Sequence, residues 1–190
     1  MKDIIIETDR LILRKISEND YREIANILQD IEVMYAWEKS FSDEEVRNWI
    51  NENLKRYDDE GYSYFLALNK NDNKVVGVMG PLIEYINNDS FIGVAYILNK
   101  NSWGYGYATE GIKACIDYAF SKLNADKVIA QIRPSNINSC NVANRLNMKI
   151  QDSYIKIYDN KKMKHLIYCI DKNEYLKLKS SNFQFNLKFK

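Results

Sequence analysis

The spacing of apolar residues divides the first third of the chain into one strand and two helices. An apolar run followed by alternating apolar and charged positions, over residues 4–13, predicts a first strand. Apolar residues at helical spacing over residues 20–28 predict a first helix. Ser42, with Glu45 three positions later, forms a capping box, so a second helix begins there and should end before Gly61.

The rest of the chain alternates between short strand patterns and helical ones. The strand-like segments lie at residues 64–68, 75–79, 91–98, 127–132, 149–158 and 166–170. A glycine turn at residues 103–107 precedes a helix with an apolar stripe, and residues 138–146 predict a short helix. The predicted order is therefore β-α-α-β-β-β-α-β-α-β-β. Because strands stand before and after a central helix, this order indicates a mixed sheet with helices on both faces.

Composition and charge are those of an ordinary globular domain. The chain has 190 residues, of which 46% are hydrophobic and 28% charged, and its formal net charge is only +1. This balance gives no reason to expect a nucleic-acid or membrane partner. No apolar run approaches the roughly 20 residues of a membrane helix, and the start of the chain contains no signal-peptide core. We therefore expect a cytoplasmic protein with one domain at residues 1–176 and a tail at residues 177–190.

The metal-binding and redox residues are few and scattered. Cys115, Cys140 and Cys169 form no CxxC pair, and His165 is the only histidine. A zinc site has almost no ligands available, so we expect no metal. The cysteines are expected as reduced thiols in or near the core, and catalysis by a Cys–His pair is disfavoured.

The tail has an apolar alternation on a basic background. Phe183, Phe185, Leu187 and Phe189 occupy every second position, which is a strand pattern with one apolar face. Three outcomes stay open: a disordered end, a strand docked on this chain, or a strand docked on a second subunit. The last would make the protein an oligomer, so both a monomer and a homodimer are compatible with the sequence.

The glycine turn is suited to holding a phosphate group. Gly104 and Gly106 let the backbone approach a ligand closely because no Cβ blocks it, and Ala108 leaves the helix start uncrowded. The free N–H groups of the first helical turn then face the anion. The turn is neither a Rossmann fingerprint nor a P-loop, because both of those glycine patterns are missing.

Three separated strings resemble the N-acetyltransferases of the GNAT superfamily. Residues 103–110, Trp-Gly-Tyr-Gly-Tyr-Ala-Thr-Glu, look like the W-G-x-G-Y-A-T-E signature of the branch that acetylates ribosomal-protein N-termini. Residues 7–14 are similar to its E-T-x-R-L-x-L-R start, and residues 134–139 to its P-x-N-x-x-S segment. Trp103 stands where the superfamily's pyrophosphate turn has Gln or Arg. The resemblance covers about residues 4–175 and implies an α+β, three-layer fold with a mixed, mostly antiparallel central sheet.

The resemblance implies that acetyl-CoA is the cosubstrate. The cofactor-binding residues that it implies are Tyr96, Ile97, Leu98, Trp103, Gly104, Tyr105, Gly106, Tyr107, Ala108, Thr109, Asn136 and Ser139. Backbone groups of the first three are expected to pair with the pantetheine arm. Amides from Gly104 to Thr109 are expected to hold the pyrophosphate, and Asn136 to contact the pantetheine or the thioester end.

Two catalytic roles follow from the same resemblance. The backbone N–H of Leu98 is expected to stabilise the tetrahedral oxyanion, which is worth ~3 kcal/mol. The hydroxyl of Ser139 stands where relatives place a group near the CoA sulfur, so it can protonate the departing thiolate. Alternatively, Ser139 caps the helix or bonds Asn136.

The usual proton acceptor and donor of relatives are missing. Gln131 and Ala143 stand where one branch has a glutamate and a tyrosine, and Gly93 stands where relatives often have a carboxylate. Deprotonation through water, with Glu84 or Tyr96 nearby, is the remaining hypothesis. A catalyst without a dedicated base can still act by proximity, worth ~7 kcal/mol or more.

The acceptor should lie between the two early helices and the last strands. The candidates to line its groove are Trp37, Glu38, Trp49, Tyr57, Tyr85, Tyr154 and Tyr158. Glu38 or Glu84 could attract a cationic amine, although a solvated surface role is the alternative for either. Three functions compete: acetylation of a protein N-terminus or small amine, acetylation of an antibiotic or polyamine, and non-catalytic binding of acyl-CoA.

Overall fold

The computed structural model describes residues 4–158, 160–180 and 188–189. In chain order the strands are β1 (Ile4–Glu7), β2 (Leu11–Lys15), β3 (Phe65–Asn69), β4 (Val75–Ile86), β5 (Asp89–Leu98), β6 (Lys127–Ile132), β7 (Lys149–Tyr158), β8 (Lys161–Asp171) and β9 (Lys188–Phe189). The helices are α1 (Tyr21–Leu28), α2 (Asp43–Asp59), α3 (Tyr107–Lys122), α4 (Ile137–Arg145) and α5 (Lys172–Ser180), with 3-10 turns η1 (Glu18–Asp20) and η2 (Lys100–Ser102).

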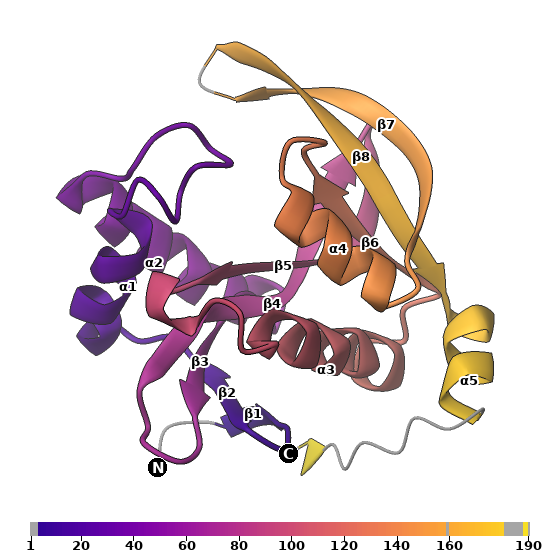
Figure 1. Ribbon diagram of the computed structural model, residues 1–190, viewed down its shortest axis with the longest axis horizontal. Coiled ribbons are helices and arrows are strands. Elements are labelled where there is room, and N and C mark those ends of the chain that lie inside the picture. Colours follow the sequence, from indigo (N-terminus) through magenta and orange to yellow (C-terminus); the bar gives the residue numbers. More distant parts are fainter. Residues whose placement is uncertain (1–3, 159, 181–187, 190) are drawn as a thin grey trace.

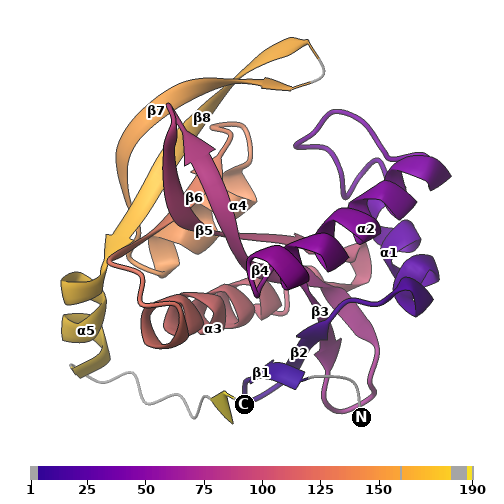
Figure 2. The same cartoon turned by 180° about the vertical axis from the view of Figure 1, so that it is seen from behind.

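Within the described residues, all strands join one sheet in the order β7-β8-β6-β5-β4-β3-β2-β1-β9. Every neighbouring pair is antiparallel except β5 and β6, which are parallel. Helices α1 and α2 lie on one face, and α3 and α4 on the other (Figures 1 and 2). The predicted mixed, mostly antiparallel sheet between two helical layers is confirmed.

The parallel pair in the middle of the sheet is short. Strands β5 and β6 share only two residue pairs, Ile92 with Val128 and Gly93 with Ile129. After these pairs β6 continues to pair with β8, and β5 with β4. Among the residues that the structure describes, the sheet therefore opens beyond Gly93 and one edge of β5 has no strand partner.

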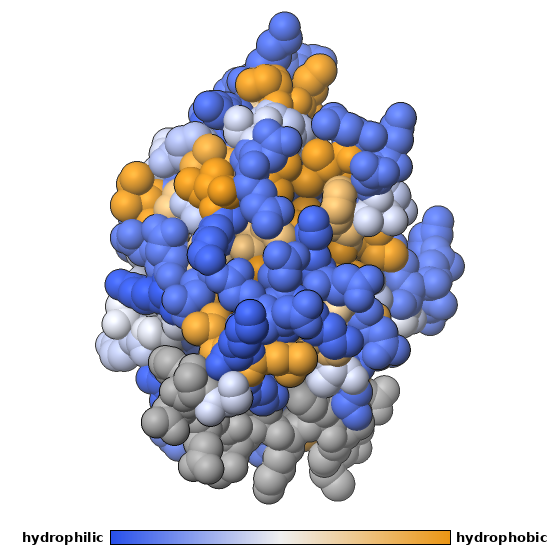
Figure 3. All heavy atoms as spheres, turned by 90° about the vertical axis from the view of Figure 1, so that its right-hand side faces the viewer, coloured by the Kyte–Doolittle hydropathy of each residue, from blue (hydrophilic) through white to orange (hydrophobic). Residues whose placement is uncertain are grey.

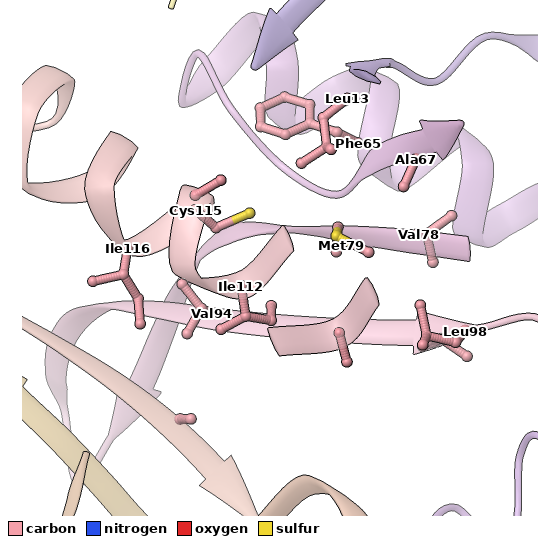
Figure 4. Packing of buried hydrophobic residues seen from close by; sticks show 14 of the residues in the cluster. Leu13, Phe65, Ala67, Val78, Met79, Val94, Leu98, Ile112, Cys115 and Ile116 are labelled. Atoms are coloured by element: carbon pink, nitrogen blue, oxygen red, sulfur yellow. The ribbon is translucent and has the colours of Figure 1, made fainter. Parts of the chain in front are cut away.

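Helix α3 is packed closely against β4, in the layer shown in Figure 4. A Cβ built on Gly111 would lie 1.9 Å from the sulfur of Met79, so only glycine permits this approach. Ile112, Cys115 and Ile116 of α3 are all buried in the same cluster, and each large apolar side chain contributes about 2 kcal/mol by burial. This packing fixes the start of α3 beside the end of β5.

The first predicted strand is wrong, because residues 4–15 form a hairpin of two strands. The buried Thr8 closes the turn: its N–H donates to the carbonyl of Leu11, and its hydroxyl accepts from the Leu11 N–H, both at 2.9 Å. A threonine hydroxyl that binds backbone two or three residues away competes with strand pairing. The chain therefore reverses at residues 8–10 instead of running on.

The predicted turn at residues 87–89 is confirmed, but β4 reaches it and does not end at residue 79. Asn87 and Asn88 have φ of 50° and 71°, the left-handed values that a two-residue hairpin turn requires. The tight turn lets β4 and β5 pair along their whole length, including Glu84 with Phe91. Strand β8 likewise begins at residue 161, five residues earlier than predicted.

The chain after β8 holds a helix that the sequence pattern did not indicate. Helix α5 runs across the predicted start of the tail, and its Tyr175 and Lys179 bond Asp117 of α3, the lysine at 2.7 Å. Strand β9 pairs with β1 of the same chain, so residues 188–189 match the second of the three predicted outcomes. Phe183, Phe185 and Leu187 lie outside the described residues.

The surface on the side of α5 and β8 is mostly polar, with separate apolar patches (Figure 3). Strand β7 at the sheet edge exposes Ile150, Ile155 and Ile157. No helix in the described ranges is long and apolar enough to cross a membrane.

Candidate active site

The glycine turn adopts the backbone that an anion site needs. Gly104 and Gly106 have φ of 82° and 79°, and Gly106 is the N-cap of α3. A Cβ at Gly104 would meet no atom within 4 Å, so the space beside the turn is open. The amides of the first turn of α3 therefore face an accessible space, where the helix dipole favours a negative charge.

Two of the three sequence motifs meet at this turn. Glu110 of α3 accepts hydrogen bonds from the hydroxyl of Thr8 at 2.6 Å and from the backbone N–H of Arg10 at 2.9 Å. The guanidinium of Arg10 contacts the same carboxylate at 2.6 Å and donates to the carbonyl of Tyr105 at 2.9 Å. We call Thr8, Arg10 and Glu110 the turn clamp. Sequence reasoning found both motifs and missed their connection, which only the fold provides.

The open edge of β5 presents backbone groups at defined positions. Leu98 faces Gly77 in the ladder, and the N–H of Asn99 donates to the carbonyl of Val76 at 2.9 Å. In an antiparallel ladder this pattern makes Leu98 a non-hydrogen-bonded position. The N–H and C=O of Leu98, and by alternation those of Tyr96, therefore point away from β4 toward the opening.

The same alternation separates the three residues predicted to hold the pantetheine arm. Tyr96 and Leu98 direct backbone groups into the opening, whereas those of Ile97 point to β4. The carbonyl of Leu98 accepts a hydrogen bond from the indole N–H of Trp103 at 3.2 Å. Trp103 thus ties the glycine turn to the end of β5 and leaves the N–H of Leu98 facing the site.

A cavity of about 390 Å³ follows this edge and the glycine turn; we call it the cofactor cavity. The predicted cofactor residues that line it are Tyr96, Ile97, Leu98, Trp103, Gly104, Gly106, Tyr107, Ala108, Thr109, Asn136 and Ser139. Tyr105 does not line it: its side chain is 63% exposed, and its carbonyl serves the turn clamp. An extended strand edge that leads to a helix N-terminus fits the pantetheine and pyrophosphate of acetyl-CoA.

Asn136 and Ser139 stand at the start of α4. Asn136 is the N-cap: its Oδ1 accepts from the N–H of Ser139 at 3.1 Å and from the hydroxyl of Tyr35 at 2.6 Å. The idea that Ser139 caps the helix is therefore wrong, although its amide does bond Asn136. The hydroxyl of Ser139 instead lies 3.1 Å from the hydroxyl of Tyr96. Burial raises the pKa of Tyr96, which keeps this pair of hydroxyls protonated.

A second cavity, of about 270 Å³, begins at the same two hydroxyls; we call it the acceptor cavity. It shares six lining residues with the cofactor cavity: Ala36, Trp37, Tyr96, Asn136, Ser139 and Val142. Its remaining walls come from strands β4 to β8, from helices α3 and α4, and from the segments that connect them. The two cavities therefore adjoin, and the Tyr96–Ser139 pair lies among the residues that they share; we call this place their junction.

Glu84 and Gln131 of the acceptor cavity belong to a hydrogen-bonded row whose third member, Tyr154, lies behind them and, contrary to the prediction, does not line the cavity. Gln131 donates to Oε2 of Glu84 at 2.9 Å, and Tyr154 donates to the amide oxygen of Gln131. Burial raises the pKa of Glu84, although Lys156, Arg56 and the Gln131 hydrogen bond oppose this effect. Gln131 occupies the position at which one branch of the family resembled has a glutamate. In this structure it binds and positions the carboxylate of Glu84, which comes from β4.

Glu38 is held by the protein's own cations. It lies in the loop between α1 and α2 and forms ion pairs with Arg133 at 2.7 Å and with Lys161 of the β7–β8 hairpin at 3.1 Å. Arg133 also donates to the carbonyl of Ala36 at 2.7 Å. Glu38 therefore does not offer a free carboxylate to an amine. It fastens the loop to the other side of the acceptor cavity.

The predicted aromatic lining is partly wrong. Trp37 and Tyr158 line the acceptor cavity. Tyr57 is 7% exposed and packs in the core, and Tyr85 is 67% exposed on β4. Trp49 packs against Tyr64, with 5.3 Å between ring centroids, and lines neither cavity. Aromatic content alone does not distinguish a wall of the cavity from the core beside it.

His165 also lines the acceptor cavity, which the sequence did not indicate. Its Nδ1 lies 3.1 Å from the carbonyl of Met163. Since a carbonyl only accepts, Nδ1 carries the proton; burial lowers the pKa of the ring. Cys115, Cys140 and Cys169 are free thiols, as predicted. In the described ranges no group of three or more acidic, histidine or cysteine side chains could hold a metal.

The opening in the sheet, the glycine turn and the two adjoining cavities fit an acyl-CoA-dependent transferase. Residues 10–149 match the family described as the acetyltransferase (GNAT) domain, so the chain belongs to the GNAT acetyltransferases. YkkB of Bacillus subtilis (strain 168), an uncharacterized protein, is 30% identical over 142 residues, which cover 74% of this chain and 83% of YkkB.

Solved structures of this family share the fold. A ribosomal-protein alanine acetyltransferase from Vibrio fischeri has a TM-score of 0.72 and 21% identity, covering 91% of this chain and 99% of its own. A spermidine N-acetyltransferase from Vibrio cholerae, solved with CoA and spermine, has a TM-score of 0.71 and 20% identity, covering 87% and 98%. These two enzymes act on different acceptors, so the likeness establishes the fold and leaves the acceptor to the site itself.

Proposed function

We propose that this enzyme transfers the acetyl group of acetyl-CoA directly to a primary amine that carries a single positive charge, either a protein N-terminus or a small amine. The observation that carries this proposal is the junction of the two cavities at Tyr96 and Ser139. A thioester in one cavity and an amine in the other meet there. Cys140 lines neither cavity, so a covalent acetyl-cysteine step is not needed.

The cofactor cavity supplies binding mostly from the main chain. The exposed backbone groups of Tyr96 pair with the pantetheine arm as an added strand would, and the N–H of Leu98 stays free for the reaction centre. The amides from Gly104 to Thr109 hold the pyrophosphate at the start of α3. Asn136 supports the cofactor cavity only indirectly. Its side-chain oxygen already accepts hydrogen bonds from the hydroxyl of Tyr35 and from the N–H of Ser139 at the start of α4.

At the junction, the oxyanion and the thiolate need different partners. The N–H of Leu98 points into the opening and donates to the oxyanion, a contact worth ~3 kcal/mol. The Tyr96–Ser139 hydroxyl pair donates a proton to the thiolate as the C–S bond breaks. The raised pKa of Tyr96 keeps a proton available for that step.

The charges of the acceptor cavity favour a monocation over a polyamine. Among the described residues that line it, Glu84 is the single carboxylate, and Arg133 and Lys156 are cations. Spermidine or an aminoglycoside carries several positive charges, which this lining would repel. A non-catalytic acyl-CoA module would need neither a paired hydroxyl at the thioester nor a buried carboxylate, so these groups favour an enzyme.

Calorimetry with acetyl-CoA, followed by an assay of thiol release, tests this function. The probes are an alanine-initiated tetrapeptide, phenethylamine, spermidine and kanamycin. We expect binding of acetyl-CoA and thiol release that depends on the peptide or on phenethylamine. Faster release with spermidine or kanamycin would contradict the acceptor class, and binding without any release would contradict acetyl transfer.

A further inference from the structure

Gly93 of β5 precedes Val94, which lines the acceptor cavity, and has no side chain of its own. A Cβ built on Gly93 would lie 2.6 Å from Cγ of Glu84, a residue of the neighbouring strand. Real carbon atoms do not approach so closely, so the side chain of Glu84 fills the space that a larger residue at this position would occupy. In the ladder Glu84 faces Phe91, two residues before Gly93 and on the same face of the sheet.

Hydrogen bonds hold the carboxylate of Glu84 in one orientation. Tyr154 donates to the amide oxygen of Gln131, which turns the amide NH2 group toward Oε2 of Glu84 at 2.9 Å. Among the described residues, no donor contacts the second oxygen, Oε1. Glu84 lines the acceptor cavity, so this oxygen is available to an amine that enters it.

The surroundings leave Glu84 as a suitable base. The titratable and charged groups around it are Arg56 of α2, Tyr64, Tyr154 and Lys156 of β7, and His165 of β8. Burial raises the pKa of both tyrosines, that of Tyr154 to about 12, so they stay neutral near pH 7. Burial also moves the pKa of Glu84 upward, toward the operating pH at which a general base is most effective.

We infer that Glu84, leaning from β4 over Gly93, is the catalytic proton acceptor of the acetyl transfer proposed above, on which this inference rests. The ammonium of the acceptor gives one proton to Glu84, and the neutral amine attacks the thioester carbon to form a C–N bond. As the C–S bond breaks, the thiolate takes a proton from the Tyr96–Ser139 pair, which regains one from the nitrogen. Glu84 releases its proton to solvent, so each turnover yields one amide, one thiol and one proton.

Gln131 and Gly93 are positioning residues in this arrangement. Gln131 fixes the direction of the carboxylate through one hydrogen bond. Gly93 leaves the volume in which the side chain of Glu84 lies. Neither residue contributes a proton.

The first test compares wild type with Glu84→Gln, a change that keeps shape and can still accept from Gln131. We expect kcat with the alanine-initiated tetrapeptide or phenethylamine to fall about 100-fold at pH 7, with the affinity for acetyl-CoA within twofold. Asp89→Asn, which removes an exposed carboxylate at the tip of the same hairpin, should leave both unchanged.

The pH profile separates catalysis from a structural role. Because the base must be ionised, kcat/KM of wild type should fall as the pH drops through the raised pKa of Glu84. This acidic limb should disappear in Glu84→Gln and persist in His165→Gln, which removes the imidazole from the same cavity. A limb that persists in Glu84→Gln would overturn the assignment.

A relocation of the carboxylate tests the geometry. Glu84→Ala should lose the activity. The double variant Glu84→Ala, Gly93→Glu should have a kcat at least about tenfold above that of Glu84→Ala, because the new side chain starts from the space that Glu84 leaves. Gly93→Ala alone should push Glu84 aside and lower kcat without weakening acetyl-CoA binding. A folded double variant that binds acetyl-CoA and recovers nothing would contradict the position of the base.

The inference and the proposed function fail in distinguishable ways. No thiol release from wild type with any of the four probes would overturn the proposed function, and the inference with it. Acceptor-dependent release from wild type that Glu84→Gln retains in full would overturn the role of Glu84 alone.

Discussion

The cofactor cavity and the acceptor cavity share the Tyr96–Ser139 hydroxyl pair, yet they are built mostly from different parts of the polypeptide. The first is formed mainly by backbone: the open edge of β5, two glycines with positive φ and the start of α3. The second is formed by single side chains from many elements, such as Glu84, Tyr158 and His165. Binding a fixed ligand through the backbone constrains few side chains, whereas choosing an acceptor requires particular side chains in three dimensions.

The largest effect is expected at the glycine turn. Gly106→Val places a β-branched residue at a φ of 79° and removes aligned amides, so acetyl-CoA should bind about 100-fold more weakly, ~2.7 kcal/mol. Gly61→Val is the matched control. Gly61, which follows α2, has a similar φ of 86° and lines neither cavity. Calorimetry should show unchanged affinity there. Equal losses in both variants would mean general destabilisation.

Substitutions at the junction of the two cavities should lower the turnover and leave the binding of acetyl-CoA unchanged. Ser139→Ala and Tyr96→Phe each remove one member of the hydroxyl pair, so each should lower kcat at least about tenfold while the Kd for acetyl-CoA stays within twofold. The double variant should lower kcat little more than either single substitution does, because the two hydroxyls share one hydrogen bond. Ser121→Ala on the far end of α3 is the control. Unchanged kcat in Ser139→Ala would leave that hydroxyl a structural role only.

A change in the turn clamp should alter the affinity for acetyl-CoA and leave the KM for the acceptor unchanged. Glu110→Gln removes a charge from the group that binds Thr8 and Arg10, and should weaken acetyl-CoA binding about tenfold. The KM for the acceptor should not change, as steady-state kinetics would show. Glu174→Gln, which breaks an exposed ion pair with Lys149, should change neither quantity. A changed KM for the acceptor in Glu110→Gln would contradict the expectation that the two cavities bind their ligands independently.

The smallest effect is expected at the loop that Glu38 fastens. Glu38→Gln loosens the exposed pairs with Arg133 and Lys161, so the KM for the acceptor should rise about two- to fivefold, with the Kd for acetyl-CoA unchanged. Glu32→Gln in the same loop, whose partner is Lys100, serves as the control. A larger change in Kd than in KM would place this loop with the cofactor cavity instead.

Most of the fold was predictable because its elements carry strong local patterns. The capping box at Ser42, the apolar stripe of α3 and the asparagine turn at residues 87–88 each appear in the structure. The hairpin at residues 8–10 and helix α5 were missed. The first depends on the side chain of Thr8, and the second on contacts with Asp117, and neither leaves a periodic signal.

By itself, the sequence determined the family, the sheet with helices on both faces and the glycine turn, because such a turn needs glycines at fixed local spacing. Only the tertiary structure decided that Thr8 and Arg10 hold the glycine turn, and that a carboxylate reaches the acceptor cavity from Glu84 across Gly93. A side chain's neighbours on adjacent strands depend on register and on where the sheet opens. Long-range pairing sets both, so the acceptor half of the site could not be read from the sequence.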